Sequence, residues 1–258
     1  MNQRTSQSLA VIGGGTMGVG IAYVFAVAGW QVYVVEPDDA RSTSMLQTLK
    51  GAAEGGLKRG KLNAAQAAQA SEGVQRLVAV EDLPRLLDLV IESVPERLDL
   101  KLKVLAQVAL RQPRLIASNT SALSINELAS SVPDPSSFLG MHFFNPVWSL
   151  PMVELVRGDQ TSEDALAMAR EFAQSTGKTT ITVRDVPGFA TSRLDLIASL
   201  EAMRMLEDGV ASAEDIDHAL VTAYRHPMGP LRLSDIVGLD VRLDIARHLS
   251  QALGPRYA

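Results

Sequence analysis

The stretch Leu9-Ala-Val-Ile-Gly-Gly-Gly-Thr-Met-Gly18 joins four apolar residues to a glycine-rich turn. The apolar residues Leu9–Ile12 are typical of a strand buried on both faces of a sheet. After the turn, Thr16–Ala28 is small and apolar and is followed by Gly29, as at the end of a helix. Gln31–Val35 is rich in β-branched residues and predicts a second strand. This order of strand, turn, helix and strand predicts a βαβ unit.

The turn has the spacing Gly-x-Gly-x-x-Gly. In a βαβ unit, Gly13 permits the tight turn, Gly15 lets the backbone approach a pyrophosphate, and Gly18 lets the helix pack closely on the strand. The helix N-terminus then presents free N–H groups and the positive end of its dipole to phosphates. The motif therefore predicts a dinucleotide site, whereas the alternative is a glycine-rich turn without a ligand. The predicted cofactor contacts in the turn are Gly13, Gly14, Gly15, Thr16, Met17 and Gly18.

Glu36 closes the second predicted strand. A carboxylate at this place accepts hydrogen bonds from the ribose hydroxyls and repels a 2′-phosphate. The next four residues, Pro37–Ala40, contain no Arg or Lys that would offset its charge. The sequence therefore predicts NAD rather than NADP, and the alternative is an ordinary surface glutamate.

The rest of the chain alternates strand and helix patterns and then becomes helical. Strands are predicted at Val74–Val80, Leu89–Ser93, Leu115–Ser118, Phe138–Phe144, Met152–Val156 and Thr179–Val183, and the late helices at Ser192–Glu207, Ala213–Tyr224 and Val237–Leu253. Capping-box patterns at Asn63 and Ser124 predict two further helix starts. We expect a Rossmann-type α/β domain with a doubly wound, mostly parallel sheet over residues 1–186. A smaller all-α domain is expected over residues 187–258, with the boundary near Pro187.

Composition excludes several classes of function. Hydrophobic residues make up 47% and charged residues 21% of the 258 residues, which is ordinary for a globular protein with a core. The net charge of −5, without a block of like charges, gives nucleic-acid binding no electrostatic support. The chain has no cysteine, so disulfides, thiol nucleophiles and zinc ribbons are excluded, and no metal site is predicted. The absence of cysteine agrees with a cytoplasmic location. Although Leu9–Val35 is uncharged, its repeated glycines favour a buried βαβ unit over a membrane span.

One histidine and one glutamate are candidates for acid–base chemistry. His142 lies near the end of a predicted strand in Met141-His-Phe-Phe-Asn-Pro146, and Glu154 lies in the next strand. A carboxylate beside an imidazole orients its tautomer, raises its pKa and stabilises the imidazolium. The pair suits a base that takes a hydroxyl proton while hydride leaves the carbon. The alternative is a core histidine with a structural partner.

Further candidates follow two of the predicted strands. Glu96 follows Leu89–Ser93 at the edge where such sheets bind cofactors, and Lys101 lies on the next helix, either near the cofactor or on a solvated face. Ser118-Asn-Thr-Ser121 offers small polar groups that bind a substrate oxygen or, alternatively, form a polar turn and helix cap.

Five strings carry a family resemblance. They are Val11-Ile-Gly-Gly-Gly-Thr-Met-Gly18, Ala117-Ser-Asn-Thr-Ser121, Gly140-Met-His-Phe-Phe-Asn-Pro146, Val186-Pro-Gly-Phe189 and His226-Pro-Met-Gly-Pro230. In this order and spacing the chain resembles the L-3-hydroxyacyl-CoA dehydrogenase family, particularly its bacterial 3-hydroxybutyryl-CoA dehydrogenases. The resemblance implies NAD-dependent interconversion of (S)-3-hydroxyacyl-CoA and 3-oxoacyl-CoA by a homodimer joined largely through its helical domain.

The resemblance also implies residue roles. His142 matches the base, Glu154 its paired carboxylate, and Ser121 the serine that hydrogen-bonds the substrate's 3-oxygen. The positions that match cofactor contacts are Glu36, Glu96, Lys101, Ser121 and Asn145.

The chain departs from the family pattern in three places. Ser192 stands where the family usually has an asparagine near the substrate, and Gly55–Lys61 has glycine at one usual lysine position. Lys58, Arg59 and Lys61 in this segment either meet CoA phosphates or form a solvated basic face. The family usually continues beyond a point like Tyr257, so a weaker dimer or substrate-side wall is expected.

These departures keep two alternatives open. One is an NAD-dependent dehydrogenase of a free hydroxy or sugar acid on the same scaffold. The other is a non-catalytic NAD-binding structural protein, as the lens crystallins on this scaffold illustrate. The retained Ser121, His142 and Glu154 argue against the second alternative.

Overall fold

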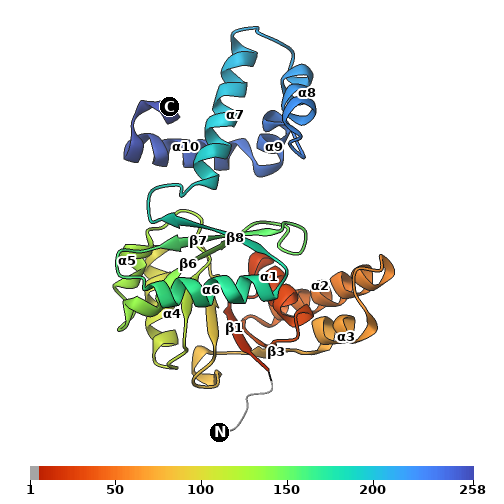
Figure 1. Cartoon of the computed structure of the whole chain (residues 1–258), viewed down its shortest axis with the longest axis vertical. Helices are drawn as coiled ribbons and strands as arrows, with labels where there is room; N and C mark the ends of the chain where they lie inside the picture. The colour runs from red at the N-terminus through yellow and green to blue at the C-terminus, as the bar shows by residue number, and fades with distance from the viewer. Residues whose placement is uncertain (1–5) are drawn as a thin grey trace. The chain divides into compact units, whose positions relative to one another are not determined.

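The computed structural model describes residues 6–258, which divide into two compact units between Asp185 and Val186 (Figure 1). The first unit contains a single sheet with helices on it, and the second is helical.

The sheet of the first unit has eight strands in the order β3-β2-β1-β4-β5-β6-β7-β8. The strands are β1 (Ser8–Ile12), β2 (Gln31–Val35), β3 (Val74–Leu77), β4 (Leu89–Glu92), β5 (Ile116–Ser118), β6 (Phe138–Phe143), β7 (Met152–Arg157) and β8 (Thr179–Arg184). Neighbouring strands run parallel except at β6 and β7, which pair antiparallel. The predicted Rossmann-type, mostly parallel sheet is thereby confirmed.

Helices cover both faces of this sheet. They are α1 (Thr16–Val27), α2 (Asp39–Lys58), α3 (Ala64–Glu72), α4 (Leu98–Ala109), α5 (Ile125–Ala129) and α6 (Glu163–Ser175). Helices α1, α2, α3 and α6 share one apolar core with the strands, while α4 packs on β4 and α5 on β6. The uncharged run Leu9–Val35 forms β1, α1 and β2, and no described helix is long and apolar enough to cross a membrane.

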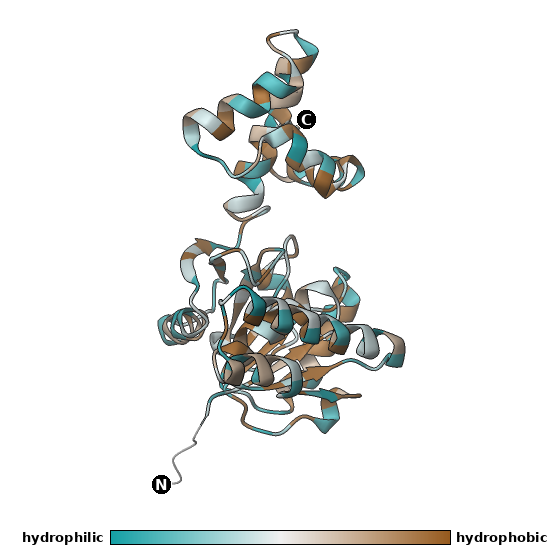
Figure 2. Cartoon of the chain, turned by 90° about the vertical axis from the view of Figure 1, so that its right-hand side faces the viewer, coloured by the Kyte–Doolittle hydropathy of each residue, from teal (hydrophilic) through white to brown (hydrophobic). Residues whose placement is uncertain are grey.

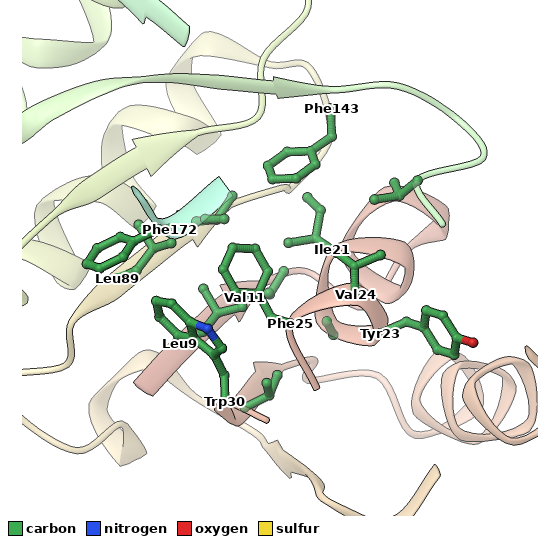
Figure 3. Packing of buried hydrophobic residues seen from close by; sticks show 14 of the residues in the cluster. Leu9, Val11, Ile21, Tyr23, Val24, Phe25, Trp30, Leu89, Phe143 and Phe172 are labelled. Carbon is green, nitrogen blue, oxygen red and sulfur yellow. The ribbon is translucent and has the colours of Figure 1, made fainter. Parts of the chain in front are cut away.

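Three aromatic rings pack together in the core between α1, β2 and α6. Trp30 contacts Phe25 and Phe172 edge to face, with ring centroids 4.9 and 5.0 Å apart (Figure 3). All three side chains are buried. The strands of the sheet are largely hydrophobic (Figure 2). Edge-to-face pairs add about 0.5–1.5 kcal/mol each to the burial of their surface, so this cluster fixes α1 on the sheet.

Some predicted elements differ from the observed ones. The strand predicted at Val74–Val80 ends at Leu77, because the chain turns into the 3₁₀ helix η1 (Val80–Asp82) beyond the edge of β2. Asn63 forms the predicted capping box with Gln66. Ser124 caps α5 but forms no box: its hydroxyl donates to Asp185, 2.6 Å away, and accepts from the Glu127 N–H.

The second unit contains α7 (Thr191–Glu207), α8 (Ala213–Tyr224), α9 (Pro230–Val237) and α10 (Leu239–Leu253). Sequence patterns missed α9 and began the last helix at Val237. Gly238 ends α9 and precedes α10. Its φ of +99° is a backbone conformation that a residue with a Cβ adopts only under strain. Asp217 accepts the N–H groups of Leu231 and Arg232 and so caps the start of α9, a long-range contact that local patterns do not show.

Candidate active site

A cavity of about 1020 Å³ opens at the carboxyl ends of β1, β2, β4, β5 and β6. This is the edge where open α/β sheets bind ligands, next to the point at which the strand order reverses around β1. Its walls include several of the predicted site residues: Gly13, Gly15, Thr16, Met17, Glu36, Glu96, Ser121, His142 and Asn145.

The glycine-rich turn has the close contacts that its spacing requires. Gly13 has a φ of +108°, and its N–H donates to the Val35 carbonyl, 2.9 Å away. A Cβ on Gly18 would lie 1.9 Å from the Gly13 carbonyl oxygen, so α1 can approach the turn only with glycine there. Gly15 is exposed, and a Cβ on it would meet no protein atom within 4 Å. The turn therefore has the open cradle above a helix N-terminus that suits a pyrophosphate.

Glu36 is buried at the end of β2 and faces the turn. Its carboxylate accepts from the Gly14 N–H and the Asp38 N–H, both at 3.0 Å, and lies 3.2 Å from Nε of Arg41. Arg41 directly follows Pro37–Ala40, the four residues that contain no basic side chain. The first turn of α2 brings its guanidinium group next to the Glu36 carboxylate. These contacts hold the Glu36 carboxylate in one position, unlike that of an ordinary surface glutamate.

Lys101 is buried and lies behind the cavity wall. Its ammonium contacts the Glu92 and Glu96 carboxylates at 2.7 and 3.2 Å, and donates to the Val94 carbonyl. The solvated-face alternative for Lys101 is therefore wrong, because its side chain is 1% exposed. Lys101 does not line the cavity, so its predicted influence on a cofactor would pass through Glu96. Glu92, which sequence reasoning missed, also accepts from the Ser118 hydroxyl at 2.6 Å.

Glu96 holds the loop that follows β5. One carboxylate oxygen accepts from the Thr120 hydroxyl at 2.5 Å and from the N–H groups of Ser121 and Ala122 at 3.0 and 3.1 Å. Burial raises the pKa of Glu96, but the Lys101 ammonium and the hydrogen bonds of Thr120 and Ser121 outweigh burial and hold the pKa below its usual value. Glu96 is therefore ionised, and its carboxylate positions Ser121 in the cavity.

The lowered pKa of Glu96 predicts an effect of acid on stability. The folded state binds the proton of this carboxyl more weakly than the unfolded chain does. Its contribution to the free energy of unfolding is then complete above the ordinary pKa and is lost as pH falls through the folded-state pKa. We expect Glu96→Gln to be less stable than wild type at pH 7, with the difference shrinking below about pH 4. Urea unfolding of the cofactor-free proteins at pH 7 and at about pH 3 measures this difference in stability.

Glu72→Gln is a matched control for this experiment, since Glu72 is exposed on α3. A stability difference between Glu96→Gln and wild type that stays constant from pH 7 to pH 3 would contradict the argument.

His142 and Glu154 face each other directly across β6 and β7. The Nδ1 atom of His142 lies 3.0 Å from Oε2 of Glu154, and both side chains are buried. The carboxylate fixes the tautomer with the proton on Nδ1, so Nε2 is the nitrogen suited to exchange a proton in the cavity that His142 lines. Asn119, which belongs to the predicted polar segment Ser118–Ser121, accepts from the Phe143 N–H at 2.9 Å and ties β5 to this strand end.

Lys178 holds the loop that follows Asn145. Its ammonium donates to the carbonyls of Val147 and Leu150 at 2.6 and 2.7 Å. Burial lowers the pKa of Lys178. A buried lysine just before β8 was not recognisable in the sequence, because its carbonyl partners become neighbours only when β8 pairs with β7.

Three predicted substrate contacts of the first unit lie outside this cavity. Lys58, Arg59 and Lys61 are exposed at the end of α2 and just beyond it. Ser192 is half-buried in the first turn of α7 in the second unit. No group of histidine, cysteine or carboxylate side chains in residues 6–258 is arranged to hold a metal ion.

Comparisons with known proteins agree with this architecture. Residues 8–186 match the family model "3-hydroxyacyl-CoA dehydrogenase, NAD binding domain", and residues 188–258 match the model of the C-terminal domain of the same family. A 3-hydroxybutyryl-CoA dehydrogenase of Mycobacterium tuberculosis is 41% identical over 240 residues, which cover 91% of this chain and 83% of that protein.

Solved structures give the same result. The crystal structure of (S)-3-hydroxybutyryl-CoA dehydrogenase from Ralstonia eutropha superposes with a TM-score of 0.91 at 37% identity, covering 98% of this chain and 90% of that chain. A diketoreductase that acts on dicarbonyl compounds has a TM-score of 0.84 at 27% identity, covering 98% and 89%. The resemblance seen in the sequence motifs is confirmed, and the chain belongs to the 3-hydroxyacyl-CoA dehydrogenase family.

Proposed function

We propose that this protein interconverts (S)-3-hydroxyacyl-CoA and 3-oxoacyl-CoA of short chain length with NAD as hydride carrier. The observation that carries the proposal is the His142–Glu154 pair at the wall of the cavity that also contains the glycine-rich turn. Family membership supports the same reaction, and the relatives from Mycobacterium tuberculosis and Ralstonia eutropha are both named 3-hydroxybutyryl-CoA dehydrogenases.

The proposed chemistry at the substrate is a proton transfer coupled to hydride transfer. Bound NAD⁺ supplies the acceptor for the hydride that leaves carbon 3. Nε2 of His142 takes the proton of the 3-hydroxyl group, and the Glu154 carboxylate stabilises the resulting imidazolium. The Ser121 hydroxyl donates a hydrogen bond to the 3-oxygen, on a loop held by Glu96. In the reverse direction the same imidazolium returns the proton to the oxygen.

The remaining predicted contacts have corresponding roles. We propose that the turn Gly13–Gly18 binds the pyrophosphate, Glu36 the adenosine ribose, and Glu96, Ser121 and Asn145 the nicotinamide half. Lys58, Arg59 and Lys61 are proposed to meet CoA phosphates, and their exposure leaves them accessible to such a ligand. Ser192 is proposed to reach the substrate through water, since serine is shorter than asparagine.

The experiment that tests the function compares a thioester with free acids. We expect NADH oxidation with acetoacetyl-CoA to have a kcat/KM at least about 100-fold above that with acetoacetate or a keto sugar acid. The reason is that binding energy from the distant CoA moiety contributes to the rate at carbon 3. Rates are measured by NADH absorbance. Replacing Lys58, Arg59 and Lys61 together by Gln is expected to lower kcat/KM for acetoacetyl-CoA and to leave kcat/KM for acetoacetate unchanged.

Two outcomes would point to the alternatives. A preference for free acids or simple dicarbonyls would favour the free-acid dehydrogenase, for which the similarity to a diketoreductase is the supporting observation. Tight NADH binding without turnover of any acyl-CoA would favour the non-catalytic protein.

We also propose a cytoplasmic homodimer joined through the helical unit. Supporting this, α7, α9 and α10 expose apolar side chains at Leu194, Ile236, Leu239 and Leu243, with exposed fractions of 47–69%. Apolar surface on several helices of a small unit is typical of an interface between subunits. Sedimentation velocity is expected to give twice the chain mass of 27.7 kDa, and a monomer at micromolar concentration would contradict the proposal.

A further inference from the structure

The strand order indicates where the adenine of the cofactor must lie. This inference rests on the proposed NAD site. Strands β2 and β3 lie on one side of β1, whereas β4, β5 and β6, with the Ser121 loop and His142, lie on the other. A dinucleotide with its ribose at Glu36 and its nicotinamide near His142 therefore crosses β1. Its adenine lies beyond Glu36, between the segment after β3 and helix α4.

The walls of this end of the cavity are apolar on their faces and polar at one edge. The apolar lining consists of Val78, Ala79, Val80, Leu100 and Val104, which suits the two faces of a purine ring. The polar side chains here are Glu81 on η1, Gln107 on α4, and Arg41, which is paired with Glu36. Glu81 and Gln107 come from separate elements and meet at the same edge.

The hydrogen bond between these two side chains fixes what each can offer a ligand. Nε2 of Gln107 lies 3.3 Å from Oε1 of Glu81. A carboxylate only accepts, so the amide must turn its NH₂ group toward Glu81. One proton of Nε2 is then used on Glu81, and the other remains as a donor. The backbone of η1 is held by the Ala79 N–H, which donates to the Asp82 carboxylate at 3.1 Å, so Glu81 sits on a defined turn.

We propose that Glu81 and Gln107 read the amino-bearing edge of the adenine and so select it over other purines. The Glu81 carboxylate accepts from the 6-amino group, and the second Nε2 proton of Gln107 donates to the adjacent ring nitrogen N1. Hypoxanthine carries an oxygen at position 6 and a proton on N1. Both contacts are then mismatched, with oxygen facing a carboxylate and one N–H facing another. The geometry thus makes the base, and not only the ribose, a determinant of cofactor choice.

The test compares NADH with reduced nicotinamide hypoxanthine dinucleotide, which differs only at that edge. Dissociation constants are measured by dihydronicotinamide fluorescence, which needs no turnover. For wild type we expect the hypoxanthine form to bind at least about 10-fold more weakly, since the loss of the hydrogen bond to the charged Glu81 alone implies an effect of this size. In Glu81→Gln the ratio should fall to about 1 or below, because the new amide can donate to the 6-oxygen. The control Glu72→Gln, on exposed α3, should keep the wild-type ratio.

The dinucleotide measurements distinguish a failure of the base-reading role from a failure of the proposed cofactor site. Equal binding of both dinucleotides to wild type, or an unchanged ratio in Glu81→Gln, would overturn the base-reading role while leaving the dehydrogenase intact. Failure of wild type to bind NADH at all would instead overturn the proposed cofactor site. Gln107→Leu gives a second check: it removes the N1 donor together with the hydrogen bond to Glu81 and should weaken NADH binding, and unchanged NADH binding would also overturn the base-reading role.

Discussion

Replacement of His142 by glutamine is expected to lower kcat for acetoacetyl-CoA reduction by about 10²–10⁴-fold. Glutamine has a similar length and can still donate to Glu154, so the buried carboxylate keeps a hydrogen bond. An amide, however, cannot carry a proton between pH 5 and 9 in the way that imidazole does. The substitution therefore removes proton transfer while leaving the pairing of β6 with β7 in place.

The measurement is kcat at saturating NADH, together with the dissociation constant for NADH. The latter should stay within about twofold of wild type, because His142 takes no part in the glycine-rich turn. His248→Gln is a matched control, since that histidine is exposed on α10 and should leave kcat unchanged. Full activity in His142→Gln would show that another group moves the proton.

Replacement of Gly18 by alanine is expected to lower stability and to raise the dissociation constant for NADH by at least about 10-fold. The new Cβ would lie 1.9 Å from the Gly13 carbonyl oxygen and 3.3 Å from a methyl group of Val11. Since backbone cannot move aside as a flexible side chain does, α1 must shift away from β1. Overpacking of this kind costs about 1–3 kcal/mol, and the shift also misplaces the N–H groups that meet the pyrophosphate.

Two other glycines separate these effects. Gly15→Ala meets no protein atom within 4 Å and should weaken NADH binding without loss of stability, because its Cβ enters only the ligand's space. Gly51→Ala, at an exposed position of α2 with similar free space, should leave NADH binding unchanged and slightly raise stability. Urea unfolding and NADH fluorescence report the two quantities. Wild-type values in Gly18→Ala for both would refute the close-packing argument.

The sequence predicted most of the sheet because its strands are continuous apolar runs and its turns are marked by glycine. Those signals are local, and they located β1, α1, β2 and the glycine-rich turn within one or two residues. The proximity of His142 and Glu154 was also suggested by their places on successive predicted strands. By contrast, α9 was missed because its cap, Asp217, lies on another helix.

The candidate site was predicted less completely than the fold. Sequence motifs found many residues of the cavity wall, and they also found Glu96 and Glu154, which hold Ser121 and His142. They missed other groups that hold the site in place. Glu92 is one example: only the pairing of β4 with β5 places its carboxylate beside Ser118, and only the packing of α4 brings Lys101 to it. Arg41 is another example. It lies five residues after Glu36, and the two side chains meet only because the first turn of α2 brings Arg41 back toward the carboxylate.

The sequence by itself determined the dinucleotide-binding turn, since the required backbone conformations and close contacts permit little besides glycine. It also determined the acidic residue at the end of β2 and the presence of one strand-borne histidine with a carboxylate in the next strand. Only the tertiary structure decided which ionisable groups are buried together, as with Lys101 between Glu92 and Glu96, and which polar edges meet in the cavity, as with Glu81 and Gln107. The physical reason is that local backbone preferences are encoded over a few residues. The partners of a buried charge or of a ligand's edge come from separate elements, which meet only when the chain packs.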